Sequence, residues 1–294
     1  MIGPPEIALR RVCVAYLAWG PLGVGHVRRF VDSYIANPAG VDHALVIILN
    51  HVGREDRDEI AGMLRDIPHS TFAPERPVLD LEAYRLLTET IAADAYCFFN
   101  TYSRVLAPGW LFRYVAALRE RSIGVAAAGG SYRSLRDFNP WRSGPTMLPL
   151  PKKALLQLAT TRRALRIRRQ FPPNPCASVR SNAFALRAST LALIDWPKCE
   201  SKMDTWLWES GRQNLTVRTR EAGLRAVVVD RYGAIFDVPD WPQSATFWSR
   251  DQDGLLVADN RSDEYACATA HDRRRLMREN WSGDELGHAF RRRR

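Results

Sequence analysis

Two asparagines stand where apolar runs end, and their side chains could bind a ligand. Asn50 follows the apolar run 44–49, and Asn100 follows the run 95–99. Asn100 also opens a polar, uncharged stretch, Asn-Thr-Tyr-Ser. Amide and hydroxyl groups can hydrogen-bond a ribose or phosphate oxygen. They bring no negative charge, so a hard divalent cation would gain little from them.

Other familiar catalytic patterns do not occur. The six histidines form no HxH or HExxH arrangement, which argues against a metal hydrolase, and the chain has neither a Walker loop nor GxSxG. Its five cysteines are scattered and without CxxC spacing. This usage argues against a disulfide framework or zinc site and fits a reducing compartment.

The elements that must position these residues alternate along the chain. Apolar runs predict strands over 12–18, 44–49, 95–99, 124–128, 182–186 and 225–230. Helical spacing predicts helices over 27–35, 54–65, 79–91, 108–121, 189–194, 213–222 and 270–281, and Gly223 is placed to end the 213–222 helix. Such alternation predicts an α/β fold with a mostly parallel central sheet, in which ligands bind at the carboxyl ends of the strands.

The bulk composition fits one large soluble domain. The chain has 294 residues, of which 46% are hydrophobic and 25% charged. We expect a main domain over 1–235 that carries a basic helical insertion at 138–180. A polar C-terminal extension, 236–294, packs on it and ends in a basic tail. The first long apolar run is interrupted at Gly20-Pro21 and no signal peptide is evident, so we expect a cytoplasmic protein.

The net charge of +10 is concentrated in one region. Residues 138–194 contain ten Lys and Arg and no Asp or Glu. Leucines and cations mix at 148–171, as in a helix that lies on an anionic membrane surface. A solvated basic helix is the alternative, because the arginines fall on several sides. No module that would bind nucleic acid is visible, so we expect no nucleic-acid partner.

Several local signatures occur in an order that resembles glycosyltransferases of the GT-A fold, of the broad family 2 kind. They are the opening "VAYLAWGPLGVGHVRRFVDSY", then "VIILN", "FFNTYSRVLAPGWL", "SNAFALR" and "REAGLRAVVV". The resemblance covers residues 10–235. It implies a Rossmann-like GT-A domain and the transfer of a sugar from a nucleotide-sugar donor.

The resemblance also implies where the substrates bind. It places the donor near Tyr16, Asn50, Asp80, Tyr84, Asn100, Tyr102 and Ser103. It places the acceptor and phosphate groups near Asn174, Arg180, Asn182, Trp206 and Arg212. Asp80 could instead simply favour the start of its helix.

A base is needed to remove the acceptor proton if the transfer inverts the anomeric centre. The resemblance places this base after "SNAFALR", where the chain offers Asp204 and Glu209. Glu209 is nearer to the expected position, and Asp204 could orient the acceptor. Alternatively, both acids lie on a helix whose Trp206 and Trp208 pack inward. If they do not pack inward, these tryptophans could stack on sugar rings.

The chain departs from the family at its metal site. Asn100 and Tyr102 stand where the family has the two aspartates of a DxD motif, which hold a divalent cation. A Mg or Mn ion is therefore possible but not expected. Arg104, Arg180, Arg187 and Arg212 could neutralise the diphosphate instead. The alternatives are that catalysis has been lost, or that Asn100 only caps the next turn.

The resemblance implies an inverting glycosyltransferase, and the basic segment places it at the cytosolic membrane face. Its acceptor would be a polysaccharide, a lipopolysaccharide or a lipid-linked glycan, and its oligomeric state is not indicated. The alternative is a non-catalytic relative that binds sugar nucleotides or glycans in an assembly complex. A basic nucleic-acid-binding protein is the least favoured hypothesis.

The basic segment generates a prediction. Deleting residues 152–169, or reversing their charges, should release the protein from anionic vesicles without unfolding it. Each nearby Lys or Arg adds about 1 kcal/mol of attraction to such a surface. Co-sedimentation at low and moderate salt measures this. Unchanged binding would make the segment an ordinary solvated surface.

Overall fold

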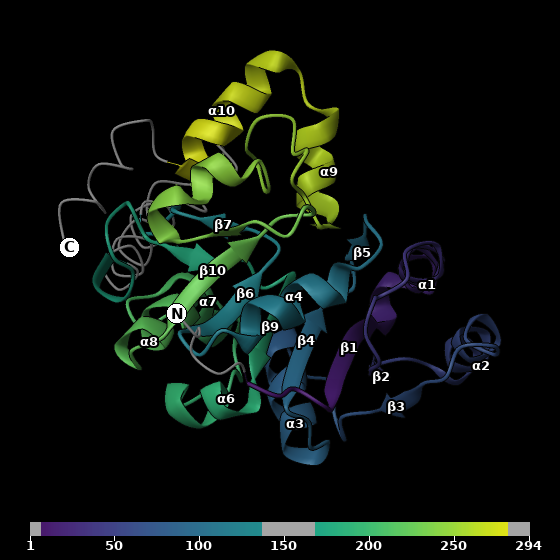
Figure 1. The fold of residues 1–294 in the computed structure, drawn as a ribbon. Helices are drawn as coiled ribbons and strands as arrows, with labels where there is room; N and C mark the ends of the chain where they lie inside the picture. Colours follow the sequence, from purple (N-terminus) through teal and green to yellow (C-terminus); the bar gives the residue numbers. More distant parts are fainter. Residues whose placement is uncertain (1–6, 137–167, 282–294) are drawn as a thin grey trace, which may run out of the picture.

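The computed structural model describes residues 7–136 and 168–281. Its centre is an eight-stranded sheet in the order β11-β10-β6-β9-β4-β1-β2-β3 (Figure 1). The strands are β1 (Val12–Trp19), β2 (Ala44–Asn50), β3 (Ser70–Phe72), β4 (Ala95–Phe99), β6 (Ile123–Ala127), β9 (Ala183–Arg187), β10 (Arg225–Val229) and β11 (Ile235–Phe236). All six strands predicted from apolar runs are present, within two residues at each end.

Most neighbouring strands of the sheet are parallel. Strand β1 pairs in parallel with β2 and β4, β2 with β3, and β6 with β10. Strand β9 is the exception inside the sheet, because it runs antiparallel between β4 and β6. The hairpin strand β11 adds an antiparallel edge. The predicted mixed α/β fold with a mostly parallel sheet is therefore confirmed.

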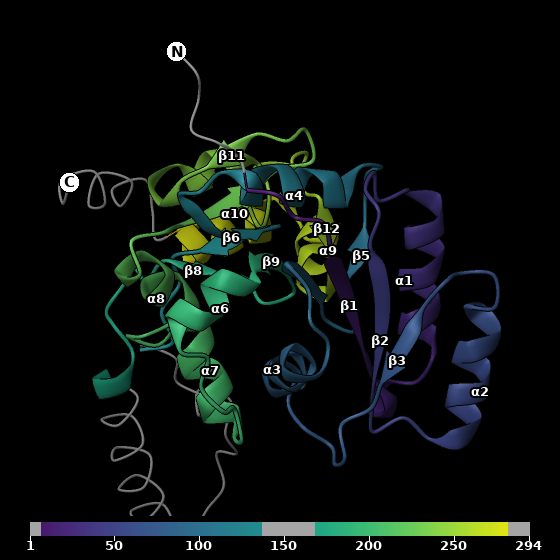
Figure 2. The ribbon, with the colours of Figure 1, turned by 60° about the horizontal axis from the view of Figure 1, so that its bottom comes forward.

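Helices cover both faces of this sheet (Figure 2). One face carries α1 (Gly25–Ala36), α2 (Arg54–Met63) and α4 (Trp110–Arg119). The other carries α3 (Asp80–Thr90), α6 (Ala188–Ile194), α7 (Lys202–Ser210) and α8 (Leu215–Glu221). Alternate residues of β1 serve the two cores: Val14 and Tyr16 face α1, whereas Cys13 and Ala15 face α3. Continuous apolar strands arise because both faces are covered.

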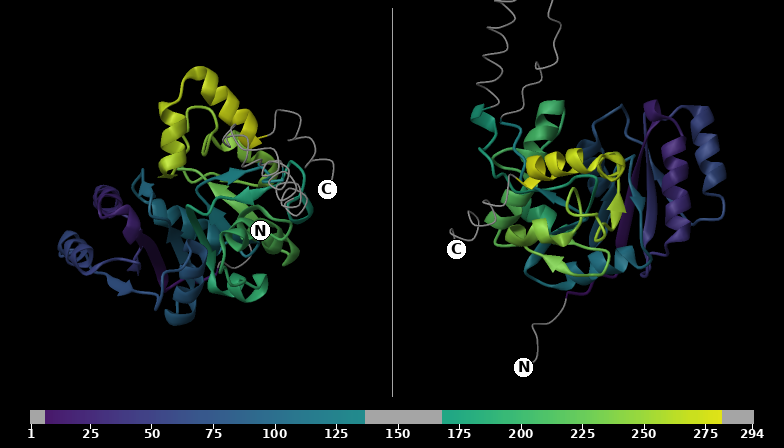
Figure 3. Two further views of the ribbon diagram at one scale, coloured as in Figure 1. Left: turned by 180° about the vertical axis from the view of Figure 1, so that it is seen from behind. Right: turned by 90° about the horizontal axis from the view of Figure 1, so that it is seen from above.

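The C-terminal part of the described chain forms a separate layer. It contains α9 (Asn260–Cys267) and α10 (Ala270–Trp281), which lie together and away from α2 (Figure 3). Two short 3-10 helices are η1 (Gly20–Leu22), which follows β1, and η2 (Val238–Ser244), which lies in this C-terminal part. Strand β5 (Arg104–Val105) pairs with β12 (Val257–Ala258), and β7 (Gly130–Ser131) pairs with β8 (Ser178–Val179).

This layer is less polar than the composition of the last 60 residues indicates. Trp241, Phe247, Trp248 and Leu256 are buried. They show neither helical nor strand periodicity, because they lie on 3-10 and irregular backbone. The predicted boundary at 235 also falls inside β11, which joins the main sheet. Helix 270–281 is present as predicted.

The predicted basic insertion falls mainly on residues 137–167, and the basic tail on 282–294. Both ranges lie outside the described residues, so these predictions remain open. No helix of the described chain is long and apolar enough to cross a membrane.

Candidate active site

A cleft of about 460 Å³ opens where strand β4 ends. Five separate parts of the chain build most of it: the start of α3, the turn after β4, the segment before β9, helix α7 and the start of α9. Its walls contain Asp80, Asn100, Tyr102, Ser131, Arg133, Leu135, Ser178, Val179, Arg180, Ser181, Asn182, Trp206, Glu209, Ser210, Asp259, Asn260 and Arg261. Seven of these were predicted from the sequence: Asp80, Asn100, Tyr102, Arg180, Asn182, Trp206 and Glu209.

The turn after β4 is fixed by the side chain of Asn100. Its Oδ1 accepts hydrogen bonds from the Tyr102 backbone N–H at 3.1 Å and the Ser103 hydroxyl at 2.9 Å. Asn100 thus caps the turn, as one interpretation proposed, and still lines the cleft. The Tyr102 ring also lines it and meets the ring of His26 edge-on, with centroids 4.8 Å apart.

Asn182 carries a buried polar atom that has no partner. The residue is 5% exposed and lines the cleft, and within the described chain its Oδ1 accepts no hydrogen bond. Its backbone oxygen accepts from the Asn100 N–H at 2.9 Å. A buried polar group without a partner is costly, and a ligand hydroxyl is one way to satisfy it.

Glu209 is half-buried in the cleft and is held by Ser181. The Ser181 hydroxyl donates to Glu209 Oε1 at 2.5 Å. Burial raises the pKa of this carboxyl, and the negative charge of Asp80 raises it further. The Ser181 hydrogen bond and the positive charges of Lys202 and Arg180 act against these two effects. A raised pKa makes the carboxylate a stronger base.

Arg180 is neutralised within the protein. Its guanidinium donates to Asp259 Oδ2 at 2.6 Å and lies 3.5 Å from the centroid of the Phe247 ring. Asp259 is only 2% exposed and caps the start of α9. This cation therefore ties the segment before β9 to the C-terminal layer.

The two tryptophans of α7 differ in position. Trp206 lines the cleft one turn before Glu209. Trp208 is buried and stacks on Trp196, with centroids 5.3 Å apart. Of the two, only Trp206 is open to a ligand in the cleft.

Four residues predicted to bind the donor lie beneath the cleft instead of lining it. Tyr16 is fully buried and donates to the Thr101 carbonyl at 2.8 Å. Asn50 is 1% exposed and exchanges two hydrogen bonds with the Val78 backbone, so it fixes the approach to α3. Ser103 is 1% exposed, 2.7 Å from the Asn182 carbonyl. These three residues support the walls.

Tyr84 is the fourth. Its ring is fully buried against Phe98, with centroids 4.7 Å apart. Its hydroxyl has no hydrogen-bond partner within the described chain, and burial raises its pKa well above the usual range. It does not line the cleft, so direct contact with a donor does not fit its position.

Asp204, Arg212 and Asn174 also lie outside the cleft. Asp204 caps its own helix: its Oδ2 accepts from the backbone N–H and the hydroxyl of Ser201, each at 2.7 Å. Asp204 and Arg212 line a different cavity of about 330 Å³. Asn174 is exposed and accepts from the Ser134 N–H at 2.7 Å.

Among the four arginines expected near a diphosphate, Arg180 alone lines the cleft. Arg104 forms an ion pair with Asp263. Arg187 is buried under the end of α4, where it donates to the carbonyls of Leu118, Glu120 and Arg121, each at 3.0 Å. Burial lowers the pKa of Arg187. Its role is structural.

Sequence reasoning missed the contribution of the C-terminal layer. Asp259, Asn260 and Arg261 line the cleft because β12 pairs with β5, which follows the Asn100 turn. The pairing of two two-residue strands leaves no periodic pattern. The one available signal was the cap pattern of Asp259 and Ser262 at the start of a helix.

The cleft does not fit the metal that the GT-A resemblance implies. Asn100 and Tyr102 carry no charge, and the Asn100 Oδ1 is already engaged by the turn. Among residues 7–136 and 168–281, no three His, Cys, Asp or Glu side chains gather as metal ligands would. No catalytic step is therefore assigned to a metal.

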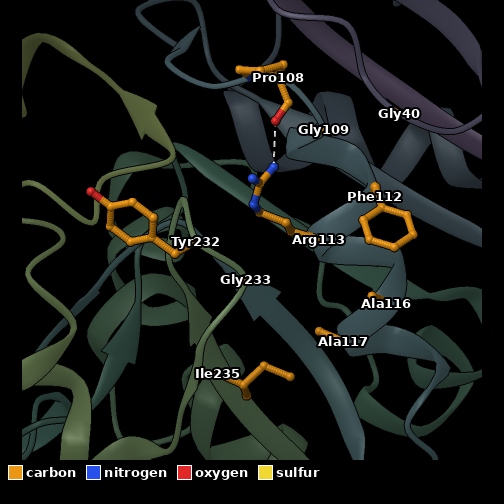
Figure 4. Close-up of a pocket in the computed structure, with 10 residues that line it drawn as sticks. All are labelled: Gly40, Pro108, Gly109, Phe112, Arg113, Ala116, Ala117, Tyr232, Gly233 and Ile235. Carbon is orange, nitrogen blue, oxygen red and sulfur yellow. Dashed lines mark hydrogen bonds between the residues drawn. The ribbon is translucent and has the colours of Figure 1, made fainter.

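A larger cavity, of about 510 Å³, lies between α4 and the β10–β11 hairpin (Figure 4). Phe112 and Tyr232 stand on opposite sides, and Arg113 points toward Pro108, whose carbonyl it bonds at 2.6 Å. Within the described chain, no acid or histidine lines this cavity. It lacks a carboxylate or imidazole, so the cleft at β4 is the candidate active site.

No protein-family model and no curated protein matches the chain. Solved structures match it in part. A mannosyltransferase from Pyrobaculum calidifontis in complex with GDP-Man and Mn²⁺ has a TM-score of 0.39 and 12% identity, over 65% of this chain and 50% of that one. Glucosyl-3-phosphoglycerate synthase from Mycobacterium tuberculosis, with Mn²⁺ and UDP, has a TM-score of 0.38 and 13% identity, over 63% and 59%.

GalNAc-T7 with UDP, GalNAc and Mn²⁺ is a third match, with a TM-score of 0.39 and 13% identity, over 68% of this chain and 41% of that one. The chain thus spans between 41% and 59% of the length of these three structures. With identity and overlap this low, a function has to be derived from the chain's own cleft.

The raised pKa of the Glu209 carboxyl leads to a prediction about the stability of the fold. Glu209→Gln should raise the melting temperature at pH 7 by about 2–4 °C, the effect of ~1 kcal/mol in a chain of this size. The reason is that ionising a carboxyl whose pKa is raised in the folded state costs stability. Thermal unfolding from pH 4 to pH 8 measures the difference.

The difference should shrink toward pH 4, where the carboxyl is mostly protonated in both folded and unfolded chains. The control is Glu200→Gln, an exposed glutamate near the same helix, which should change stability little at any pH. If the Glu209→Gln protein is instead less stable than wild type at pH 7, Glu209 is a structural anchor.

Proposed function

We propose that the protein is an inverting glycosyltransferase that moves a sugar from a nucleotide-sugar donor to a hydroxyl of a glycan or lipid-linked acceptor. One observation carries the proposal. A single cleft gathers Asp80, Asn100, Tyr102, Arg180, Asn182, Trp206 and Glu209 from distant parts of the chain. The GT-A resemblance assigned these residues to donor, acceptor and base.

The donor occupies the wall formed by Asp80, Asn100 and Tyr102. This wall lies at the carboxyl ends of the strands, where open α/β sheets bind their ligands. Asp80 lines the cleft at the start of α3, where its carboxylate accepts from sugar or ribose hydroxyls. Asn100 and Tyr102 hydrogen-bond the diphosphate.

Glu209 acts as the general base. It takes the proton of the acceptor hydroxyl while the acceptor oxygen forms a bond to the anomeric carbon. The bond from that carbon to the diphosphate oxygen breaks, and its electron pair leaves with the nucleoside diphosphate. Ser181 holds Oε1 by its hydrogen bond and so directs the other oxygen toward the substrate. Attack from the face opposite the leaving group inverts the anomeric centre.

The acceptor enters beside Trp206. Its apolar indole suits the apolar face of a sugar ring, and Asn182 offers an unpartnered oxygen to a hydroxyl. The acid-free stretch 138–194 supports an acceptor held at an anionic membrane, with the protein peripheral at the cytosolic face. We therefore place polysaccharide, lipopolysaccharide and polyprenyl-linked glycans as the acceptor classes.

The second candidate is a non-catalytic relative that binds sugar nucleotides or glycans in an assembly complex. The neutral turn at Asn100 and Tyr102 is the observation that favours it. The two candidates differ in one measurable property, which is donor hydrolysis that depends on Glu209.

Substitution of the base tests the proposal. Glu209→Gln keeps shape and hydrogen bonding but removes basicity, so turnover should fall by about 10²–10⁴. Donor affinity should stay nearly constant, because the donor wall is untouched. Slow donor hydrolysis, in which water replaces the acceptor hydroxyl, is the first assay.

Asp204→Asn is the matched control on the same helix. Asp204 caps α7 outside the cleft, so its loss should change turnover only a few-fold. The reverse ranking would move the base to Asp204. Equal and negligible effects in a proven transfer assay would leave both residues structural.

Metal dependence gives a further prediction. Nucleoside diphosphate binding should persist in EDTA, because Asn100 and Tyr102 cannot replace a pair of carboxylates as metal ligands. Calorimetry with UDP and GDP, in EDTA and in Mg²⁺ or Mn²⁺, measures this. A loss of affinity of tenfold or more on chelation would contradict the metal-free account.

A further inference from the structure

We propose that Arg261, from the C-terminal layer, is the cation that binds the leaving diphosphate in place of a metal. The inference rests on the proposed function and names the group that carries charge at the neutral turn. Sequence reasoning did not identify Arg261, and the resemblance ends before it.

The strand pairing brings Arg261 to the turn. Strands β5 and β12 are antiparallel, with Ala258 opposite Arg104 and Val257 opposite Val105. In an antiparallel pair, the residues after Ala258 run alongside those that precede Arg104. Residues 259–261 therefore pass the turn formed by Asn100 and Tyr102, and both segments line the cleft.

Arg180 and the start of α9, two other sources of positive charge in the cleft, are already engaged. Asp259 accepts from Arg180 through Oδ2, and through Oδ1 from the backbone N–H groups of Arg261 at 3.1 Å and Ser262 at 2.8 Å. Arg180 is thereby neutralised, and these first N–H groups of α9 are occupied. Neither provides a spare positive charge for a diphosphate.

Arg261 is held in place but weakly neutralised. The Trp248 indole donates to the Arg261 carbonyl at 2.9 Å, and its ring lies 5.3 Å below the guanidinium. The acid paired with Arg261 is Glu264, one turn along the same helix at 2.7 Å. Their side chains are 46% and 45% exposed. An exposed pair of this kind contributes little, so a diphosphate can displace Glu264.

The chemistry of a guanidinium suits this role. Its planar fork binds two phosphate oxygens at once and stays charged at any relevant pH. As the bond between the anomeric carbon and the diphosphate oxygen breaks, negative charge develops on the diphosphate. Arg261 stabilises that charge from one side, and the Asn100 and Tyr102 side chains hydrogen-bond from the other.

The test measures binding of inorganic pyrophosphate, UDP and GDP by calorimetry in EDTA. Arg261→Gln should weaken pyrophosphate and the better-binding nucleotide by about tenfold or more, since it removes charge-assisted hydrogen bonds. Arg261→Lys should recover part of this loss, because it keeps the charge without the fork. Uridine and guanosine, which lack phosphate, should bind both proteins equally.

Arg104→Gln is the matched control. Arg104 lies next to the same turn and pairs with Asp263 of the same helix, but it does not line the cleft. Its loss should change pyrophosphate affinity by no more than about twofold. Glu264→Gln works in the opposite direction: it frees Arg261 and should tighten pyrophosphate binding by about two- to threefold.

Three results would overturn the inference: equal affinity in wild type and Arg261→Gln, an equal loss in Arg104→Gln, or no pyrophosphate or nucleotide binding by the wild type. If Arg261→Gln fails to fold, the Glu264→Gln and Arg261→Lys proteins decide instead. Pyrophosphate binding through Arg261 without any nucleotide binding would refute the proposed function and leave Arg261 only as a pyrophosphate-binding residue. Nucleotide binding with unchanged affinity in the Arg261→Gln protein would refute this inference and leave the proposed function standing.

Discussion

The backbone carbonyl of Asn182 holds the two halves of the cleft together. It accepts the Asn100 N–H at 2.9 Å and lies 2.7 Å from the Ser103 hydroxyl. These contacts exist because β9 runs antiparallel between β4 and β6, so that its start meets the end of β4. In a fully parallel sheet, the segment before that strand would lie at the opposite edge. The reversed strand is what brings Ser181 and Asn182 to the turn.

A second junction closes the cleft from the C-terminal side. Arg180 precedes β9 and is clamped between the Asp259 carboxylate and the Phe247 ring. Because Asp259 also caps α9, this one ion pair fixes the start of that helix to the wall that carries Ser181. The side chains of Arg180 and Asp259 are 21% and 2% exposed. Removing only one of them would be costly, because the other charge would be left buried without its partner. The C-terminal layer is thus part of the site and not an appendage.

The sequence predicted the sheet well because the sheet is buried on both faces. Its strands, such as β2 and β4, are continuous apolar runs bounded by polar residues, which is the strongest pattern available. The residues at strand ends were harder to interpret. Asn50 and Asn100 follow strands in the same way, yet Asn50 is turned inward to Val78 and Asn100 lines the cleft. Nothing local separates these two cases.

The polar side chains of the cleft depended even more on tertiary structure. Glu209 and Asp204 lie on the same helix, α7. Their side chains leave it in different directions, so Glu209 lines the cleft and Asp204 lines a different cavity. Asn260 and Arg261 reach the site through two paired residues on each side, which no periodicity reveals. Tyr16 and Tyr84 show the converse: the family resemblance suggested ligand contact for them, and the structure encloses both side chains in the two cores.

The neutral turn and the chemistry of Glu209 constrain each other. Asp80 already raises the pKa of Glu209 across a cleft of about 460 Å³. Two aspartates at positions 100 and 102 would add negative charge to the same space, and without a cation they would raise that pKa further. A larger fraction of Glu209 would then be protonated, and a protonated carboxyl cannot accept the acceptor proton. Neutral side chains at the turn avoid this repulsion, but they leave a diphosphate without a counter-charge. Under the proposed function, the Arg261 guanidinium at the start of α9 would supply positive charge at the turn without adding a carboxylate ligand set, and Glu209 would stay able to act as a base.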